Sequence, residues 1–234
     1  MNKEKNMTYY TYTLNMTTLN ILSIILFIIV ASIVYLIEFN DNYTINLSLI
    51  NFFLLMFTWL IIHELLHGIG FLIFKEVKIK NITLGMFLEK GVFYCMCKQN
   101  IGKKVILTSL LFPITIIGLI TLIIGIIINN YELVYLSILN IVSSIGDIVM
   151  TIYFLKCPKD IIYLDLDDCT SFTVISNRVL DNIKVPGIML SKKGIYNPIL
   201  MYSKDKRRII ISKLSYILLI IIFILTIISI TKRI

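Results

Sequence analysis

A metal-binding pattern lies inside the second apolar stretch of the chain. His63, Glu64 and His67 form an H-E-x-x-H sequence within the run from Trp59 to Gly68. On an α-helix, residues four apart share one face, so both imidazoles can reach the same metal ion. A glutamate directly after the first histidine can accept a proton from water at such a metal. The pattern therefore predicts a metal site with Glu64 as the general base.

The alternative interpretation is a pair of buried structural histidines with a glutamate that satisfies them. These two histidines are the only ones in the chain, so they do not come from a histidine-rich background. Ionisable residues inside a membrane span are costly and are usually functional. The sequence therefore favours the metal site.

A catalytic zinc ion needs about three protein ligands, and Asp147 is the candidate for the third. It lies deep in a later apolar run, nine residues or about 13.5 Å before Lys156. His67 and His63 lie about 12 and 18 Å before Lys75 on the same scale. Two helices thus place ionisable groups at one depth. Binding a dication would remove the cost of burying the carboxylate there.

Polar residues precede Asp147 at helical spacing. Asn140, Ser143 or Ser144, and Asp147 fall on one helical face, which predicts a polar stripe lining a water-accessible cavity. Asn140 and Ser144 are also candidate partners for an oxyanion. Packing between helices through small polar side chains is the alternative for this stripe.

Composition excludes an ordinary soluble domain. The 234 residues are 58% hydrophobic with a mean hydropathy of +0.89, and apolar runs of about 20 residues are typical of membrane helices. We predict an all-α polytopic membrane protein with about five transmembrane helices, a small cytoplasmic β-like loop and a C-terminal subdomain. The apolar runs are Thr18–Ile37, Leu47–Phe74, Val105–Ile128, Leu133–Leu155 and Leu214–Ile230. No small-residue cleavage site follows the first run, which favours a retained helix over a signal peptide.

The basic residues predict the orientation of these helices. Lysines and arginines gather before the first run and within 75–104 and 156–213, whereas Glu38–Asn46 and Asn129–Glu132 contain none. The positive-inside rule places the N-terminus and both basic segments in the cytoplasm. This placement accounts for the net charge of +8 without a nucleic-acid partner and favours contact with the lipid bilayer.

The predicted organisation follows from these runs. Residues 1–17 form a cytoplasmic N-terminus, and 18–155 form a membrane domain with four helices and a cytoplasmic loop at 75–104. A cytoplasmic subdomain at 156–213 precedes a C-terminal transmembrane helix at 214–231.

Short β-like pieces occur in both cytoplasmic segments. In the loop, the alternating stretch Lys78–Leu84 and the run Val92–Met96 lie near glycines. They predict either a hairpin at the membrane surface or a simple connection. Residues 160–164 and 171–175 are β-like as well. The cysteines lie in these same segments, where thiols stay reduced, so we expect free thiols. They are Cys95, Cys97, Cys157 and Cys169.

The motifs resemble those of site-2-type intramembrane zinc metalloproteases, and more closely those of a membrane family called putative zincin peptidases. The matching sequences are His63-Glu64-x-x-His67-Gly68, then Gly146-Asp147, then Lys156-Cys157-Pro158 with Asp160. The resemblance covers about Leu55 to Asp165. In the best-known site-2 pattern Asp precedes Gly and follows an Asn- and Pro-containing stretch. Here Gly precedes Asp and those prolines are missing, which leaves the subfamily and the substrate open.

The resemblance implies His63, His67 and Asp147 as zinc ligands and Glu64 as the general base. The predicted function is zinc-dependent hydrolysis of peptide bonds in membrane proteins or peptides at a cell membrane. A bias toward Ile, Asn and Lys indicates an AT-rich bacterial genome.

Two other functions stay open. A catalytically inactive zinc-binding adaptor or immunity-type protein would not need Glu64. A small metal transporter would be expected to show paired repeats or broken helices.

Overall fold

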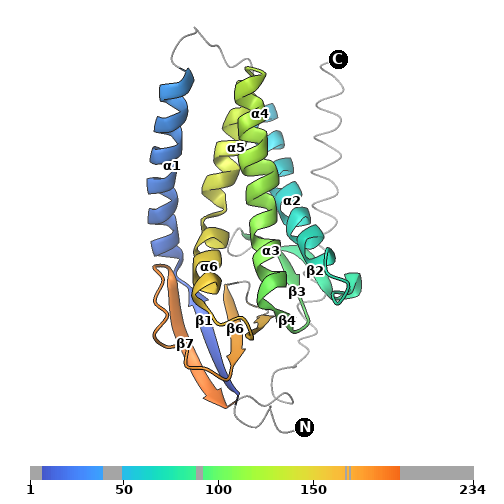
Figure 1. The fold of residues 1–234 in the computed structure, drawn as a ribbon. Helices are drawn as coiled ribbons and strands as arrows, with labels where there is room; N and C mark the ends of the chain where they lie inside the picture. Colours follow the sequence, from blue (N-terminus) through green and yellow to red (C-terminus); the bar gives the residue numbers. More distant parts are fainter. Residues whose placement is uncertain (1–6, 39–48, 88–91, 167, 169, 196–234) are drawn as a thin grey trace.

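The computed structural model describes residues 7–38, 49–87, 92–166, 168 and 170–195, and it consists of an apolar helix bundle with β-strands at one end (Figure 1). The helices are α1 (Met16–Glu38), α2 (Leu49–Leu72), α3 (Lys103–Pro113), α4 (Thr121–Ile127), α5 (Tyr131–Ser143) and α6 (Ile145–Lys156). The strands are β1 (Thr8–Leu14), β2 (Ile82–Phe87), β3 (Val92–Cys97), β4 (Ile101–Gly102), β5 (Ile162–Asp165), β6 (Ser171–Ser176) and β7 (Ile188–Ile195). A 3₁₀ turn at Ile79–Asn81 precedes β2, and a π-helical segment at Ile114–Ile120 joins α3 to α4.

The prediction of an all-α protein is wrong. Strands β4-β5-β6-β1-β7 form one antiparallel sheet, and β2 and β3 form a separate antiparallel pair. The sequence predicts local β-like pieces at β2, β3, β5 and β6, but not the strands β1, β4 and β7. Thr8 of β1 pairs with Ser176 of β6 and with Ile195 of β7, so the sheet joins the two ends of the described chain. Local sequence patterns carry no information about such distant pairing.

Strand β1 supplies the core between the sheet and α6. From Tyr10 to Thr13 tyrosine alternates with threonine, and Tyr10 and Tyr12 face inward with 2% of their surface exposed. Aromatic and β-branched residues at period two favour a half-buried strand. The Tyr12 ring lies 4.9 Å from that of Tyr153 on α6 and 5.6 Å from that of Phe172 on β6, centroid to centroid. These contacts fix the sheet against the helix that carries Asp147.

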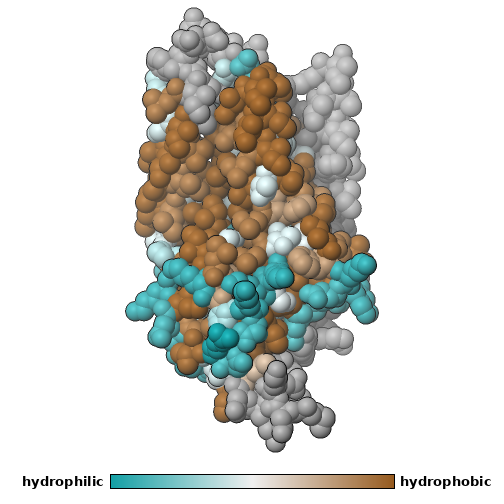
Figure 2. Space-filling model, viewed as in Figure 1, coloured by the Kyte–Doolittle hydropathy of each residue, from teal (hydrophilic) through white to brown (hydrophobic). Residues whose placement is uncertain are grey.

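The helices are suited to a membrane. Met16–Ile33, Leu54–Leu72 and Lys103–Ile127 are each long and apolar enough to cross one, and the bent pair α5–α6 would make a fourth span. The predicted span Leu214–Ile230 lies outside the described residues. Figure 2 shows apolar residues over the helices and polar residues gathered at the end that carries the sheet. The strands that precede α1, follow α2 and follow α6 all lie at that end.

The apolar run Leu133–Leu155 is not one straight helix. The hydroxyl groups of Ser143 and Ser144 both donate to the backbone carbonyl of Asn140, at 3.0 and 2.7 Å. Serine hydroxyls that bond a carbonyl one turn back bend a helix. The chain turns by 50° between α5 and α6, which places Asp147 in the first turn of α6.

Lys103 ties the start of α3 to the end of α6. Its Nζ donates to the carbonyl oxygens of Leu155 at 3.1 Å and of Cys157 at 2.6 Å. A cation at the C-terminus of a helix satisfies its free carbonyls and opposes the negative end of the helix dipole. This contact helps to hold α6 in position beside α3.

Candidate metal centre

The three side chains predicted as metal ligands converge on one point. His63 and His67 come from adjacent turns of α2, and Asp147 comes from α6. The Nε2 atoms of the two histidines lie 3.1 Å apart. The Asp147 Oδ2 lies 3.2 Å from the Nε2 of His63 and 3.4 Å from that of His67, so the three atoms form a triangle. A tetrahedral ion with bonds of about 2.0–2.1 Å needs ligand atoms about 3.3 Å apart. The triangle has the size that zinc requires, while the ligand role of each residue stays a prediction.

Two carbonyl oxygens orient the imidazoles. The Nδ1 of His63 lies 2.9 Å from the side-chain Oδ1 of Asn140, and the Nδ1 of His67 lies 2.8 Å from the backbone oxygen of Ser109. A carbonyl oxygen only accepts, so each Nδ1 carries the proton and donates it. Each Nε2 therefore directs its lone pair at the triangle, as a metal-binding histidine requires.

Close packing of α3 against α2 brings Ser109 to His67. A Cβ placed on Gly70 would lie 2.8 Å from the Cα of Ser109, so only a glycine fits at this approach. The Ser109 hydroxyl also donates to the backbone oxygen of His67 at 3.0 Å. Both histidines are buried, with 6% and 7% of their surface exposed.

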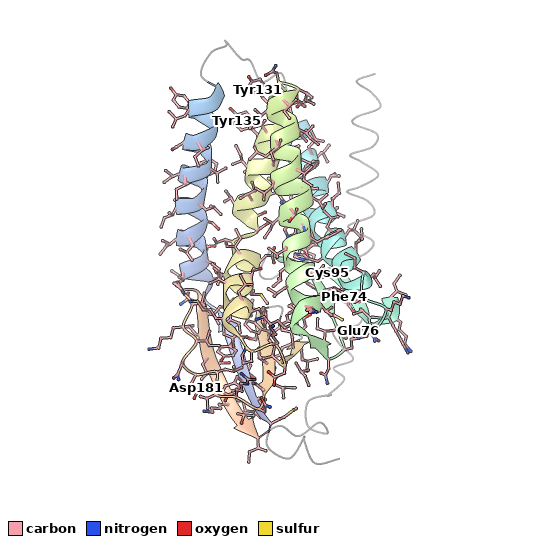
Figure 3. All side chains as sticks on the ribbon, viewed as in Figure 1. Phe74, Glu76, Cys95, Tyr131, Tyr135 and Asp181 are labelled. Atoms are coloured by element: carbon pink, nitrogen blue, oxygen red, sulfur yellow. The ribbon has the colours of Figure 1, made fainter. Side chains whose placement is uncertain are left out.

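Glu64 lies beside the triangle on the side of the β2–β3 pair. The backbone of Cys95 on β3 lies close to its carboxylate, and Figure 3 labels Cys95 next to the lower part of the helices. Glu64, the three predicted ligands and Cys95 border one cavity of about 220 Å³. At about 30 Å³ per molecule, this space holds several waters. A carboxylate, a space large enough for several waters and three groups that could hold a metal ion thus occur together.

The other residues singled out in the sequence have different places. Asn140 holds His63, whereas Ser143 borders the cavity. Asp160 lies at the surface, where its carboxylate approaches Arg178 at 3.9 Å. Lys156 donates to the backbone oxygen of Lys184 at 3.4 Å and does not border the cavity.

Sequence reasoning missed several residues that border the cavity and one backbone group that orients a predicted ligand. Tyr163 and Asp165 of β5 border the cavity from the sheet side. An acidic residue at the end of an apolar strand was the available signal for Asp165. The carbonyl of Ser109 has no sequence signal because every residue carries a backbone carbonyl.

Apolar helices, one of which carries H-E-x-x-H, and a third metal-binding group on another helix define a candidate membrane metallopeptidase. Residues 55–162 match the model of the family described as "putative zincin peptidase". The predicted resemblance to that family is confirmed over this segment, which includes His63, Glu64, His67 and Asp147. The match supports a metallopeptidase, and the family implies zinc as its ion. No curated protein and no solved structure matches the chain.

Proposed function

We propose that this protein is a zinc-dependent protease that hydrolyses peptide bonds of membrane proteins or peptides, inside the bilayer or at its edge. The observation that carries the proposal is the triangle of His63, His67 and Asp147, with edges of 3.1 to 3.4 Å, beside Glu64 in a cavity. The apolar helices around this cavity support a membrane setting. The basic segments at the sheet end favour a cytoplasmic position for that end.

The chain's own groups have distinct tasks in this reaction. Zinc at the triangle would supply a Lewis acid that polarises the scissile carbonyl and activates water near neutral pH. Glu64 takes a proton from the attacking water and delivers it to the leaving amine. Asn140 and the Ser109 carbonyl keep both imidazoles in the tautomer that binds a metal.

The edge of β3 is suited to hold a substrate in extended form. Cys95 and Cys97 lie two residues apart, and their backbone groups meet side chains away from β2, namely those of Glu64 and Asp165. A peptide bound in extended form beside Glu64 and Asp165 exposes its backbone, which a helix does not. A transmembrane substrate would therefore unwind locally before cleavage.

The first test is the zinc content of the detergent-purified full chain. We expect about one zinc per chain in the wild type, a loss in His67→Ala and in Asp147→Ala, and retention in the surface variant Asp160→Ala. No zinc after reconstitution would overturn the proposal. Zinc lost in His67→Ala alone would remove Asp147 from the ligand set.

The second test separates catalysis from metal binding. Glu64→Gln keeps the size of the side chain but removes the base, so we expect it to retain zinc and to lose peptide cleavage. Cleavage that survives this substitution would contradict the role of Glu64. A wild-type protein that binds zinc but cleaves nothing would instead be an inactive adaptor.

A further inference from the structure

A second carboxylate borders the cavity from the sheet side. Asp165 ends β5 and lines the same cavity as Glu64 and Asp147. One of its oxygens accepts from the backbone N–H of Cys97 at 2.9 Å, and the other accepts from the hydroxyl of Tyr163. Neither donor carries a charge, so these bonds do not neutralise the carboxylate.

No lysine or arginine compensates this charge within the described part of the chain. Among those residues, no lysine or arginine borders the cavity or forms an ion pair with Asp165. Burial raises the pKa of Asp165 to about 6, so the group is largely ionised near pH 7.5. A carboxylate accepts up to about four hydrogen bonds, and described residues supply two of them to Asp165. An unpaired charge in such a place is costly, so a cation from outside would be bound favourably.

The cavity would keep a net negative charge even with a divalent metal ion bound. Glu64, Asp147 and Asp165 carry three negative charges when ionised, and one dication balances two of them. With Asp147 at the metal and Glu64 acting as the base, the remaining carboxylate is Asp165. A cationic substrate group is therefore complementary to this end of the cavity.

The strand β3 sets the spacing between Asp165 and the base. The backbone of Cys95 meets Glu64, and the N–H of Cys97, two residues further, meets Asp165. Two strand residues span about 6.6–6.8 Å. A peptide extended along this edge with its scissile bond at Glu64 would bring a side chain about two residues away to Asp165.

We propose that Asp165 binds a positively charged nitrogen group of the substrate, carried about two residues from the scissile bond. The inference rests on the proposed peptidase function and adds the substrate class to it. The group is the side chain of a lysine or arginine, or a free α-amino group. Both sources donate charge-assisted hydrogen bonds to a carboxylate.

The test compares quenched fluorescent peptides cleaved by the zinc-loaded full chain in nanodiscs. Lysine is moved along the peptide one position at a time and compared with norleucine, which has a similar apolar stem and no charge. Further peptides begin at that position with a free or an acetylated amino terminus. We expect kcat/KM to rise about tenfold for lysine at one position about two residues from the bond. A higher value for the free amino terminus alone would identify that group as the source.

Variants of the carboxylate decide the assignment. Asp165→Asn should reduce the lysine preference to below about twofold, Asp165→Glu should keep it, and the surface control Asp160→Asn should leave it unchanged. Thermal unfolding of each variant verifies that it folds. An equal lysine preference in wild type and Asp165→Asn overturns the inference.

A binding measurement keeps this inference separate from the proposed function. Fluorescence anisotropy gives the affinity of Glu64→Gln for the lysine and norleucine peptides without turnover. We expect the lysine peptide to bind about tenfold tighter, and the difference to vanish when Asp165→Asn is added. If no peptide is cleaved but this difference is present, the protease proposal fails and the cation site stands. Equal binding of both peptides overturns the cation site.

Discussion

At the scale of single residues, the site depends on groups that hold the imidazoles rather than on the ligands alone. Asn140 is 3% exposed, and its Oδ1 accepts from His63 while its Nδ2 has no partner among the described residues. An unsatisfied buried amide costs about 1–3 kcal/mol. We therefore expect Asn140 to contribute more to metal affinity than to the stability of the fold.

This expectation predicts a split between metal affinity and stability for Asn140→Leu. Without the acceptor, the His63 ring loses its fixed tautomer, and zinc affinity should fall by about 10–100-fold. Competition with a chelator measures this change. Asn140→Asp should preserve the affinity because a carboxylate also accepts from Nδ1.

The matched control for that experiment is Ser137→Ala. Ser137 lies one turn earlier on α5, is fully buried, and bonds Thr121 rather than either imidazole. Its loss should lower thermal stability with little effect on zinc affinity. Equal zinc affinity in Asn140→Leu and wild type would show that Asn140 does not position His63.

Asp165 predicts a dependence of stability on pH. Burial raises its pKa to about 6, above the usual 3.9 of the unfolded chain. The native state therefore holds a proton that the unfolded state releases between about pH 4 and 6. The stability contributed by Asp165 is present below about pH 4 and is lost as pH rises through about 6.

The measurement is the free energy of unfolding of zinc-free wild type minus that of Asp165→Asn. This difference should fall by up to ~3 kcal/mol between about pH 4 and pH 7, at 1.36 kcal/mol per pKa unit. A flat difference across that range would mean that the carboxylate is not buried as described.

At the scale of elements, two features bring the metal-binding groups together: the bend between α5 and α6, and the close approach of α2 to α3. Gly70 permits that approach because a Cβ there would meet the Ser109 Cα at 2.8 Å. Gly146, one residue before Asp147, has open space where its Cβ would be. Close packing therefore requires a glycine at position 70 but not at position 146, and the sequence alone does not reveal this difference.

The pair Gly70→Ala and Gly146→Ala tests this difference. Alanine at 70 pushes α3 and its Ser109 carbonyl away from His67, so we expect a loss of about 1–3 kcal/mol in stability and weaker zinc binding. Alanine at 146 should be neutral or slightly stabilising, because alanine favours a helix by up to about 1 kcal/mol over glycine. Thermal unfolding and zinc titration measure both effects. Similar behaviour of the two variants would contradict the packing assigned to Gly70.

At the scale of the whole molecule, the sequence predicted which three groups meet better than it predicted the fold. The spacing of His63 and His67 and the matching depth of Asp147 are local quantities, and the structure brings these three groups within 3.4 Å of one another. The five-stranded sheet depends on Thr8 meeting Ser176 and Ile195, which no local pattern encodes. The bend at Ser144 was hidden because Leu133–Leu155 is one long, largely apolar run without a proline. Asp165 was hidden because its place in the cavity depends on the sheet.

The sheet constrains how the helices are oriented in a membrane, because it joins strands from distant parts of the chain at one end of the bundle. Because β1, the strands after α2 and those after α6 share one end, they must lie on one side of any membrane that the helices cross. The basic residues of these segments predict the cytoplasmic side. Asn129, in the connection between α4 and α5, lies near Tyr131, which Figure 3 places at the other end of the bundle.

Single cysteines introduced into a cysteine-free variant test this arrangement. Cysteines at Lys98 and Lys192 should be protected from a membrane-impermeant maleimide in intact cells and labelled after lysis, whereas one at Asn129 should be labelled without lysis. Labelling at 98 and 192 in intact cells, with 129 protected, would place the sheet end outside and reverse the proposed orientation. Different labelling at 98 and 192 would separate β3 from β7 across the membrane, and one common end for the strands would then be impossible.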